Sequence, residues 1–300
     1  MTTHARPLPD RALPASIRTA GALRLLTWPA LDASGADAAV TARDGGVSSG
    51  PYATLNLSLS VGDDPAAVLE NRRRLAASLG VDPGAFVFAR QVHGAGVRVV
   101  GEADRGSGAF RLDDAIADTD ALITTSAEVV LAILTADCVP IVLHDPVAGV
   151  LACVHAGWRG TVAGVTAAAV ATMQSLGSDP SDILAGVGPA IAPARYQVGP
   201  DVHQAVTGAF GPAADEFIRR DAIPGRWLLD LWAANRHALR RSGVPATQIN
   251  ITNLATGPAT PAGPATPAGP GHFFSDRVAR PCGRLALAAR LRAPGQNPWT

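Results

Sequence analysis

Three side chains of this sequence could share one metal ion: His93, Cys138 and His155. Each lies in its own short motif, QVHG, TADC and VHAGWRG in chain order. Two imidazoles and one thiolate leave the fourth tetrahedral position of Zn²⁺ open for water or substrate, whereas structural zinc sites fill all four positions and commonly contain close C-x-x-C pairs. No such pair occurs in the sequence. The pattern therefore predicts a metal site of the catalytic type.

A predicted β-hairpin brings two of these residues together. Two apolar runs flank the turn-like segment Asp145 to Ala148, a pattern typical of paired strands. If His144 pairs with Gly149 across this turn, Cys138 lies directly opposite His155 on the same face of the sheet. Directly opposed residues have Cβ atoms about 4.5–5.5 Å apart, which suits two ligands of one ion. His144 would then lie at the tip of the hairpin, too far away to be a ligand.

Composition excludes several classes of function. With 300 residues and 47% hydrophobic content, the chain can bury a large core, and we expect one large domain. The formal net charge is zero and the basic residues are not clustered, so nucleic acid is not an expected partner. All 25 basic residues are arginine, which excludes a P-loop lysine or a lysine Schiff base. The planar guanidinium group suits phosphate oxygens, so an anionic co-substrate is easy to accommodate.

The cysteines and the apolar segments indicate a cytoplasmic protein. Three widely spaced cysteines provide no disulfide framework and suit a reducing compartment. Charges and prolines occupy the N-terminal region where a signal peptide needs an apolar core. The longest uncharged stretch, residues 160–178, has helical apolar spacing typical of an amphipathic helix, so no membrane partner is expected. We expect a monomer or a small homo-oligomer.

The chain divides into an extension and one domain. Residues 1–38 have weak periodicity and are predicted to be a partly ordered N-terminal extension, followed by a single catalytic domain over residues 39–300. An Ala/Thr/Pro/Gly repeat predicts a flexible insertion at 257–271. Within the domain, the patterns predict helices over 63–79, 161–176, 200–210 and 228–242, and strands over 85–92, 97–100, 120–125, 129–135, 139–144, 149–154, 182–187, 248–254 and 285–291.

Several further motifs accompany the three that hold the candidate ligands. They are RDGGVS from residue 43, LNL from 55, VGDDP from 61, GPAI from 188 and FFS from 273. In this order, the motifs resemble those of the bacterial polyphenol oxidase or laccase-domain family (YfiH-like), which also covers zinc-dependent purine nucleoside phosphorylases. The resemblance extends over most of the chain after residue 40.

The resemblance implies an α+β fold, an α/β sandwich of mixed β-sheets flanked by helices. It also implies that His93, Cys138 and His155 bind the metal, with Zn²⁺ as the expected ion and Cu²⁺ as the alternative. The implied activities are phosphorolysis of adenosine, inosine, guanosine and methylthioadenosine, together with hydrolytic deamination of adenosine. Purine nucleosides and phosphate are thus the expected partners. The sequence departs from the family pattern at Asp276, which replaces an aromatic residue after FFS, and this departure concerns recognition of the base.

Two residues are candidates for catalysis. Asp137 is the carboxylate nearest to Cys138 in sequence and could move protons, or it could cap a turn. Arg159, in a glycine-flanked turn after His155, is the leading candidate for binding phosphate.

Three further residues are candidates for binding substrate, each with a structural alternative. Arg72 could bind phosphate or lie on a solvated helix face. Gln91 could offer its amide to substrate or make a structural hydrogen bond. Phe273 could stack on a purine or belong to the core.

Three other functions remain open for the same residues. Two histidines and a cysteine also resemble a blue-copper ligand set and allow a copper-dependent polyphenol oxidase, although seven histidines are few for several copper ions. Cys138 could instead be the nucleophile of an amide hydrolase that acts on a cell-wall precursor. The three ligands could also clamp a structural metal in a protein that is not an enzyme.

Overall fold

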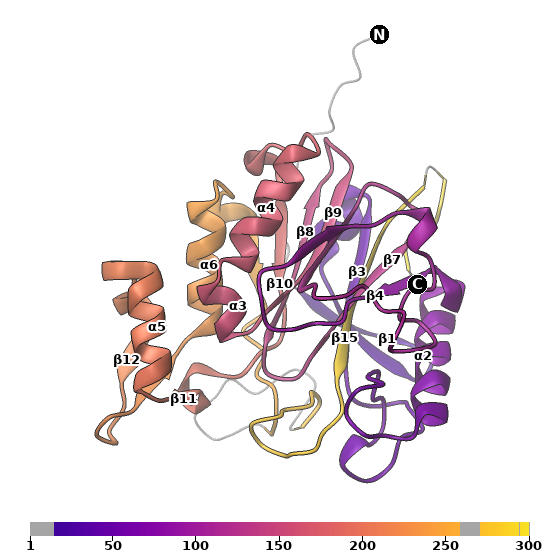
Figure 1. Ribbon diagram of the computed structural model, residues 1–300. Helices are drawn as coiled ribbons and strands as arrows, with labels where there is room; N and C mark the ends of the chain where they lie inside the picture. The colour runs from indigo at the N-terminus through magenta and orange to yellow at the C-terminus, as the bar shows by residue number, and fades with distance from the viewer. Residues whose placement is uncertain (1–14, 259–270, 294, 300) are drawn as a thin grey trace.

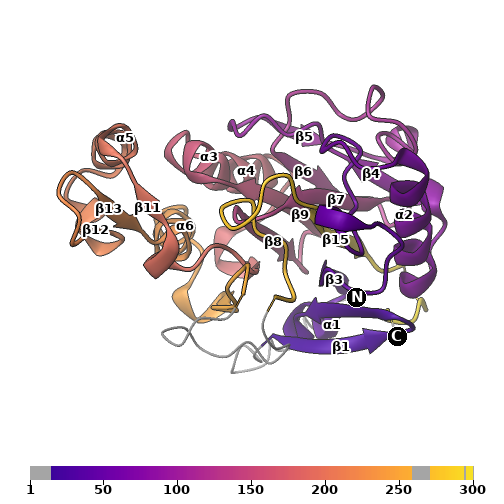
Figure 2. The same ribbon diagram turned by 90° about the horizontal axis from the view of Figure 1, so that it is seen from below.

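The structure, a computed structural model, describes residues 15–258, 271–293 and 295–299. Two six-stranded mixed sheets pack face to face, and helices cover their outer sides (Figure 1). A small three-stranded sheet extends from one side of this sandwich, as the view from below shows (Figure 2). The expected α/β sandwich of mixed β-sheets flanked by helices is confirmed.

The first sheet has its strands in the order β1-β2-β3-β15-β7-β4. Only β4 and β7 are parallel neighbours. Its inner strands are apolar runs because both faces are covered, one by the second sheet and the other by helix α2. The strands are β1 (Ser16–Ala20), β2 (Leu23–Thr27), β3 (Ala36–Thr41), β15 (Leu285–Leu291), β7 (Val130–Thr135) and β4 (Phe86–Phe88).

The second sheet has the order β14-β10-β8-β9-β6-β5 and carries the predicted hairpin, β8–β9, at its centre. Every residue of these two strands is buried. Parallel pairs occur at both edges, where β14 pairs with β10 and β5 with β6. The strands are β14 (Ile249–Ile251), β10 (Leu184–Val187), β8 (Val139–Asp145), β9 (Val150–Ala156), β6 (Ala121–Thr124) and β5 (Val97–Val99).

Helices complete the layers. Helix α2 (Pro65–Leu79) covers the outer face of the first sheet, and its N-cap Asp64 and C-cap Gly80 confirm the predicted ends of this helix. The outer face of the second sheet packs against α3 (Trp158–Val162), α4 (Val165–Ser175) and α6 (Leu231–Arg241). The remaining elements are α1 (Pro29–Ser34), α5 (Pro200–Phe210), and the small sheet of β11 (Gln197–Val198), β13 (Trp227–Leu229) and β12 (Ile218–Arg220). Among the described residues, none of the helices has the length and apolar content required to cross a membrane.

The predicted boundary at residue 38 is wrong. Strands β1 and β2 form a hairpin, and β3 lies between β2 and β15 within the first sheet. Trp28 is fully buried, and its ring packs against Gly186 of the second sheet. A Cβ at residue 186 would lie only 2.7 Å from this ring. Weak periodicity misled the prediction, because short strands with buried faces on both sides lose the alternation of a half-buried strand. Residues 1–14, and residues 259–270 of the predicted insertion, lie outside the described residues.

Two predicted elements are shorter than expected. The helix predicted over 161–176 is two helices, because Gly164 adopts a left-handed φ of 83° between α3 and α4. The strand predicted over 85–92 ends at Phe88, and Ala89 adds only an isolated bridge. The segment before His93 is therefore a loop, not a strand end.

The predicted pairing register of the β8–β9 hairpin is wrong by two residues. His144 pairs with Leu151, and Pro140, not Cys138, lies opposite His155. The Asp145 side chain accepts hydrogen bonds from the amides of residues 147 and 148, and the four-residue turn comprises residues 146–149, one position later than assumed. Since a shift of two residues preserves the face, Cys138 still lies on the His155 side of the sheet.

Candidate metal centre

The three predicted ligands come from three separate segments and meet at one point. His93 lies in the loop between β4 and β5, Cys138 in the turn between β7 and β8, and His155 in β9. Their ligand atoms all lie within 4.8 Å of one another, and the two imidazole rings meet edge to face with centroids 4.8 Å apart. His155 is buried, Cys138 is half-buried and His93 is exposed, so the centre is open on the His93 side.

Glycines allow these segments to approach so closely. A Cβ on Gly157 would lie 2.7 Å from the Cys138 sulfur and 3.3 Å from the His93 ring. A Cβ on Gly160 would lie 2.9 Å from the backbone oxygen of Gly94. Real Cβ contacts do not reach either 2.7 or 2.9 Å, so a side chain at residue 157 would require the sulfur to move, and one at residue 160 would require the backbone to move. The glycines of the VHAGWRG motif thus bring its segment against both the QVHG loop and the cysteine.

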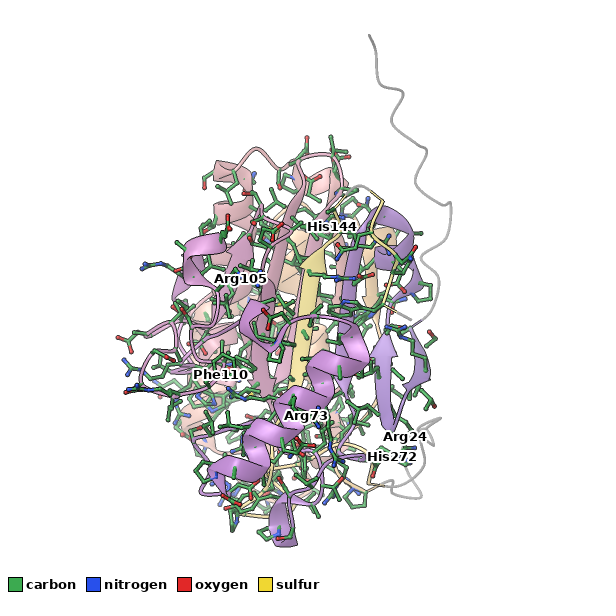
Figure 3. The ribbon with its side chains drawn as sticks, turned by 90° about the vertical axis from the view of Figure 1, so that its right-hand side faces the viewer. Arg24, Arg73, Arg105, Phe110, His144 and His272 are labelled. Carbon is green, nitrogen blue, oxygen red and sulfur yellow. The ribbon has the colours of Figure 1, made fainter. Side chains whose placement is uncertain are left out.

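The donor set fits a single tetrahedral metal ion with one open position. Sulfur–zinc and nitrogen–zinc bonds are about 2.3 and about 2.0 Å, so a small inward movement of the side chains would let all three atoms bind one ion. Over the described ranges of the chain, these residues form the one group of three or more His, Cys, Asp or Glu side chains suited to a metal. His144 is buried at the far end of β8, where its ring contacts the backbone oxygens of Ser34 and Val150 (Figure 3).

The electrostatics of the centre favour the thiolate form of the cysteine. Burial alone would raise the pKa of the Cys138 thiol, but the charge of His155 and hydrogen bonds with His155 and His93 lower it to about 6. By contrast, burial without a partner raises the pKa of the Cys153 thiol. Cys138 is therefore the cysteine prepared for metal ligation or nucleophilic chemistry, and Cys153 is a core residue.

Asp120 contacts this centre, although no pattern in the sequence predicts a role for it. Its carboxylate is fully buried, and it accepts a hydrogen bond of 2.8 Å from Nδ1 of His155. Burial alone would raise the pKa of Asp120, but hydrogen bonds from His155 and from the Gly94 amide hold it below its usual range. The one available signal was its position as the first residue of the predicted strand at 120–125, which does not reveal a partner 35 residues away.

A cleft of about 850 Å³ opens in front of the three ligands. Aromatic surface is supplied by Trp158 and Tyr196, and the carboxylates of Asp137 and Asp276 also face this space. Six arginines line the same cleft: Arg72, Arg90, Arg159, Arg277, Arg280 and Arg284. Guanidinium groups beside a metal centre suit a ligand that carries phosphate.

Arg159 lies in the cleft as predicted for a phosphate-binding residue. Its guanidinium group stacks on the Trp158 ring at 4.5 Å, and it is exposed. Within the described residues, the Arg159 guanidinium group makes neither a hydrogen bond nor an ion pair. Across the cleft, Arg277 stacks on Tyr196 and donates to the backbone oxygen of Gln197. Arg159 is therefore the more available of the two guanidinium groups.

Arg72 is buried, so the alternative of a solvated helix face is wrong. Its guanidinium group stacks on Phe88 at 3.9 Å and donates to the backbone oxygens of Leu57, Gly108 and Ala109. Burial lowers its pKa to about 9. Arg72 borders the cleft, but three of its hydrogen bonds hold surrounding loops together. Its neighbour Arg73 points outward from α2 instead (Figure 3).

Gln91 and Phe273, two of the candidates for binding substrate, make structural contacts. The Gln91 amide donates to the backbone oxygen of Leu134 and accepts from its backbone N–H, both at 2.7 Å. Gln91 thus extends the edge of β7 in place of a strand residue. Phe273 is 1% exposed and packs in the core between the two sheets, not in the cleft. Both are the structural alternatives considered from the sequence.

Asp137 faces the cleft, but both of its carboxylate oxygens have partners. One accepts a hydrogen bond from the Thr256 hydroxyl, and the other accepts from the backbone N–H of Arg277 at 2.7 Å. The residue adopts a left-handed φ of 85°, which turns its side chain out of the strand pattern assumed for it. These contacts tie two distant segments to the Cys138 turn.

Known proteins are similar to this chain in sequence. Two relatives named purine nucleoside phosphorylase are each 41% identical to the chain: YlmD of Geobacillus stearothermophilus over 224 residues, and ORF3 of Streptomyces griseus over 248 residues. The alignment with YlmD covers 74% of this chain and 81% of the relative. The alignment with ORF3 covers 83% of this chain and 91% of the relative.

Solved structures resemble the whole molecule. The crystal structure of YlmD from Geobacillus stearothermophilus has a TM-score of 0.84 at 36% identity and covers 93% of this chain and 100% of its own. The hypothetical protein YfiH of Bacillus licheniformis has a TM-score of 0.83 at 32% identity, with coverages of 92% and 99%. Residues 37–292 match the family described as multi-copper polyphenol oxidoreductase laccase. The chain therefore belongs to this multi-copper polyphenol oxidoreductase laccase family.

Proposed function

We propose that this protein is a zinc-dependent purine nucleoside phosphorylase that acts on adenosine, inosine, guanosine and methylthioadenosine. The observation that carries this proposal is one His/Cys/His centre at the base of an arginine-lined cleft. The relatives named purine nucleoside phosphorylase supply the reaction class. A single centre with three ligands argues against an oxidase that needs several copper ions, despite the family description.

The reaction exchanges one bond at the ribose. A phosphate oxygen bonds to C1′, the C1′–N9 bond breaks, and the purine leaves with a proton to give ribose 1-phosphate. When bound by His93, Cys138 and His155, zinc would supply a Lewis acid beside the reacting atoms. Arg159 would bind the phosphate and orient it, because its guanidinium group stacks on Trp158 but makes no hydrogen bond or ion pair within the described residues.

The same cleft is proposed to deaminate adenosine. In that reaction water adds at C6 of the purine and ammonia leaves, which gives inosine. Asp137 was the candidate for moving the protons, but its two oxygens already accept hydrogen bonds from Thr256 and Arg277. We therefore assign Asp137 the role of holding the cleft wall and keep Arg159 as the candidate catalytic residue.

Phosphate dependence tests the proposed function. Purified protein with a measured metal content is incubated with inosine or adenosine, with and without phosphate, and the products are separated by chromatography. We expect hypoxanthine or adenine together with ribose 1-phosphate only when phosphate is present, and inosine and ammonia from adenosine without it. Release of free ribose regardless of phosphate, or no reaction with any of the four nucleosides, would contradict the proposal.

A second candidate function rests on a specific observation. Cys138, His155 and Asp120 are arranged in the order nucleophile, base and orienting carboxylate, as in cysteine hydrolases. An amide hydrolase of this kind needs no metal. Activity toward an amide substrate that survives removal of metal by a chelator would favour this candidate over the phosphorylase.

A further inference from the structure

We infer that Asp120 is a positioning residue that holds both histidine ligands of the metal centre at once. This inference rests on the proposed metal centre, but not on the identity of the substrate. His93 and His155 lie 62 positions apart in the chain, in a loop and in a strand, and one buried carboxylate bonds to the segments of both. Two candidate ligands from separate segments would thus be fixed relative to each other by a single group.

On the loop side, the carboxylate accepts three consecutive backbone N–H groups. The amides of Val92, His93 and Gly94 donate to it at 3.2, 3.0 and 2.7 Å. His93 has a φ of 60°, a left-handed conformation that costs a non-glycine residue about 1 kcal/mol or more. Three hydrogen bonds to a charged acceptor offset this cost, so Asp120 determines the direction in which the His93 ring leaves the loop.

On the strand side, the same carboxylate fixes the tautomer of His155. Nδ1 of the ring lies 2.8 Å from Oδ1 of Asp120, and a carboxylate can only accept. Nδ1 must therefore carry a proton in either charge state of the ring, so Nε2 is the nitrogen that would bind the metal when its own proton leaves. The backbone N–H of His155 also donates to the Asp120 backbone oxygen at 2.8 Å, so ring and main chain are held from one residue.

Only a carboxylate satisfies this arrangement. Four N–H groups converge on two oxygens, and the Asp120 side chain is fully buried. An asparagine amide presents one oxygen and one NH₂ group. If the oxygen faces His155, the NH₂ group opposes the amides of Val92 and Gly94; if it faces these amides, the NH₂ group opposes the protonated His155 nitrogen.

Asp120→Asn tests the inference, with Asp118→Asn as the matched control. The control removes the same charge two residues away, from a carboxylate that is 76% exposed and 4.0 Å from Arg90. Affinity is measured with Co²⁺ alone, by competition with a chromophoric chelator on folded protein. We expect the dissociation constant to rise about 10-fold to 100-fold in Asp120→Asn. The control is expected to bind as the unsubstituted protein does.

Nitrogen NMR of the Zn²⁺-loaded protein provides a readout that a merely structural role would not change. In the unsubstituted protein, one histidine should show a proton on Nδ1 with a shift typical of a hydrogen-bonded N–H, and this signal should be lost or altered in Asp120→Asn. Equal cobalt affinity and an unchanged signal, in a variant whose only defect is a lower unfolding temperature, would overturn the inference.

Two provisions keep the test decisive. If Asp120→Asn does not fold, Asp120→Glu retains the charge but displaces the carboxylate by one methylene, and the same loss of affinity is expected; affinity equal to that of Asp118→Asn would again overturn the inference. Both readouts are obtained without substrate. Failure of nucleoside phosphorolysis would therefore reject the proposed function while leaving the role of Asp120 intact.

Discussion

Gly157 shows how one residue governs the chemistry of this centre. It follows His155 closely in the chain and lies so near the thiol of Cys138 that a Cβ at this position would require the sulfur to move. Its φ of −76° is one that alanine also adopts, so Gly157→Ala would not strain the backbone. Only the contacts of the added Cβ would be unfavourable. A substitution at residue 157 should therefore change the spacing of the candidate ligands without changing how the segment folds.

Gly157→Ala is expected to weaken metal binding without preventing folding. The added Cβ would displace the Cys138 sulfur and the His93 ring, and we expect the metal dissociation constant to rise about 10-fold to 100-fold, as for other losses of ligand positioning. Gly208→Ala, in helix α5 with nothing within 4 Å of its Cβ, is the control. Isothermal titration with Zn²⁺ checks this, and equal affinities in the two variants would contradict the assigned role of Gly157.

Arg159→Ala is expected to raise the KM for phosphate. A lost hydrogen bond to a charged group costs about 1.5–3 kcal/mol, which corresponds to an increase of about 10-fold to 100-fold. Arg73→Ala is the control, since Arg73 lies on the outer face of α2 and pairs with Glu70. Steady-state kinetics with varied phosphate provide the measurement, and an unchanged KM in Arg159→Ala would remove this residue from the phosphate site.

The sequence predicts the three candidate metal ligands but not the residues that position them. His93, Cys138 and His155 are chemically distinctive, and glycine or aspartate flanks each of them. Asp120 is one of many acidic residues, and its role depends on hydrogen bonds to segments 26 and 35 residues away. The choice between the two roles of Gln91 could not be made for the same reason, because its partner Leu134 is 43 residues distant. Such pairs arise from strand order, which local patterns do not contain.

At the scale of elements, buried polar contacts hold the helix layer beside the cleft. The Asn235 side chain of α6 donates to the Thr161 hydroxyl of α3 at 3.0 Å and accepts from the Thr166 hydroxyl of α4 at 2.8 Å. All three side chains are buried. Because α3 carries Arg159, this network connects the packing of three helices with the position of the proposed phosphate ligand.

Asn235→Ala is expected to destabilise the protein by about 2–3 kcal/mol, because it leaves two buried hydroxyls without their partner. Gln174→Ala, which removes an exposed amide from α4, should change the free energy of unfolding by less than about 0.5 kcal/mol. Urea titration monitored by circular dichroism measures both. A cost in Asn235→Ala no greater than that in Gln174→Ala would show that the network does not hold the helices together.

The elements with strong periodicity or capping residues were predictable. Helix α2 has Asp64 and Gly80 as its caps, and β15 has the predicted bounds Leu285–Leu291. The β8–β9 hairpin was recognised, but its register was not, because the turn that the Asp145 side chain caps comprises residues 146–149 and not 145–148. The break at Gly164 was missed because a glycine inside a helical pattern is tolerated as often as it ends one.

At the scale of the whole molecule, a neutral protein concentrates positive charge in the cleft, where the proposed phosphorolysis needs phosphate. The formal net charge is zero, yet six arginines and two aspartates line the cleft. Asp276, where the family pattern has an aromatic residue, forms ion pairs with Arg280 and Arg284 and so restrains two of these arginines. The cleft therefore places guanidinium groups beside the three candidate metal ligands, whereas Arg24 of β2 and His272, which contact each other, are not among the residues that line it (Figure 3).

Titration of the metal-free protein with Zn²⁺ tests the central claim most directly. Phosphorolysis of inosine is followed while zinc is added to the unsubstituted protein, to Cys138→Ala and to Cys153→Ala, whose lost thiol lies in the core. We predict that activity rises linearly and reaches its maximum at about one equivalent of zinc per chain, in keeping with a single three-ligand site. Cys153→Ala should behave in the same way, and Cys138→Ala should remain inactive. Full activity in the metal-free protein, or equal activity in the two variants, would contradict a phosphorylase centred on one zinc ion.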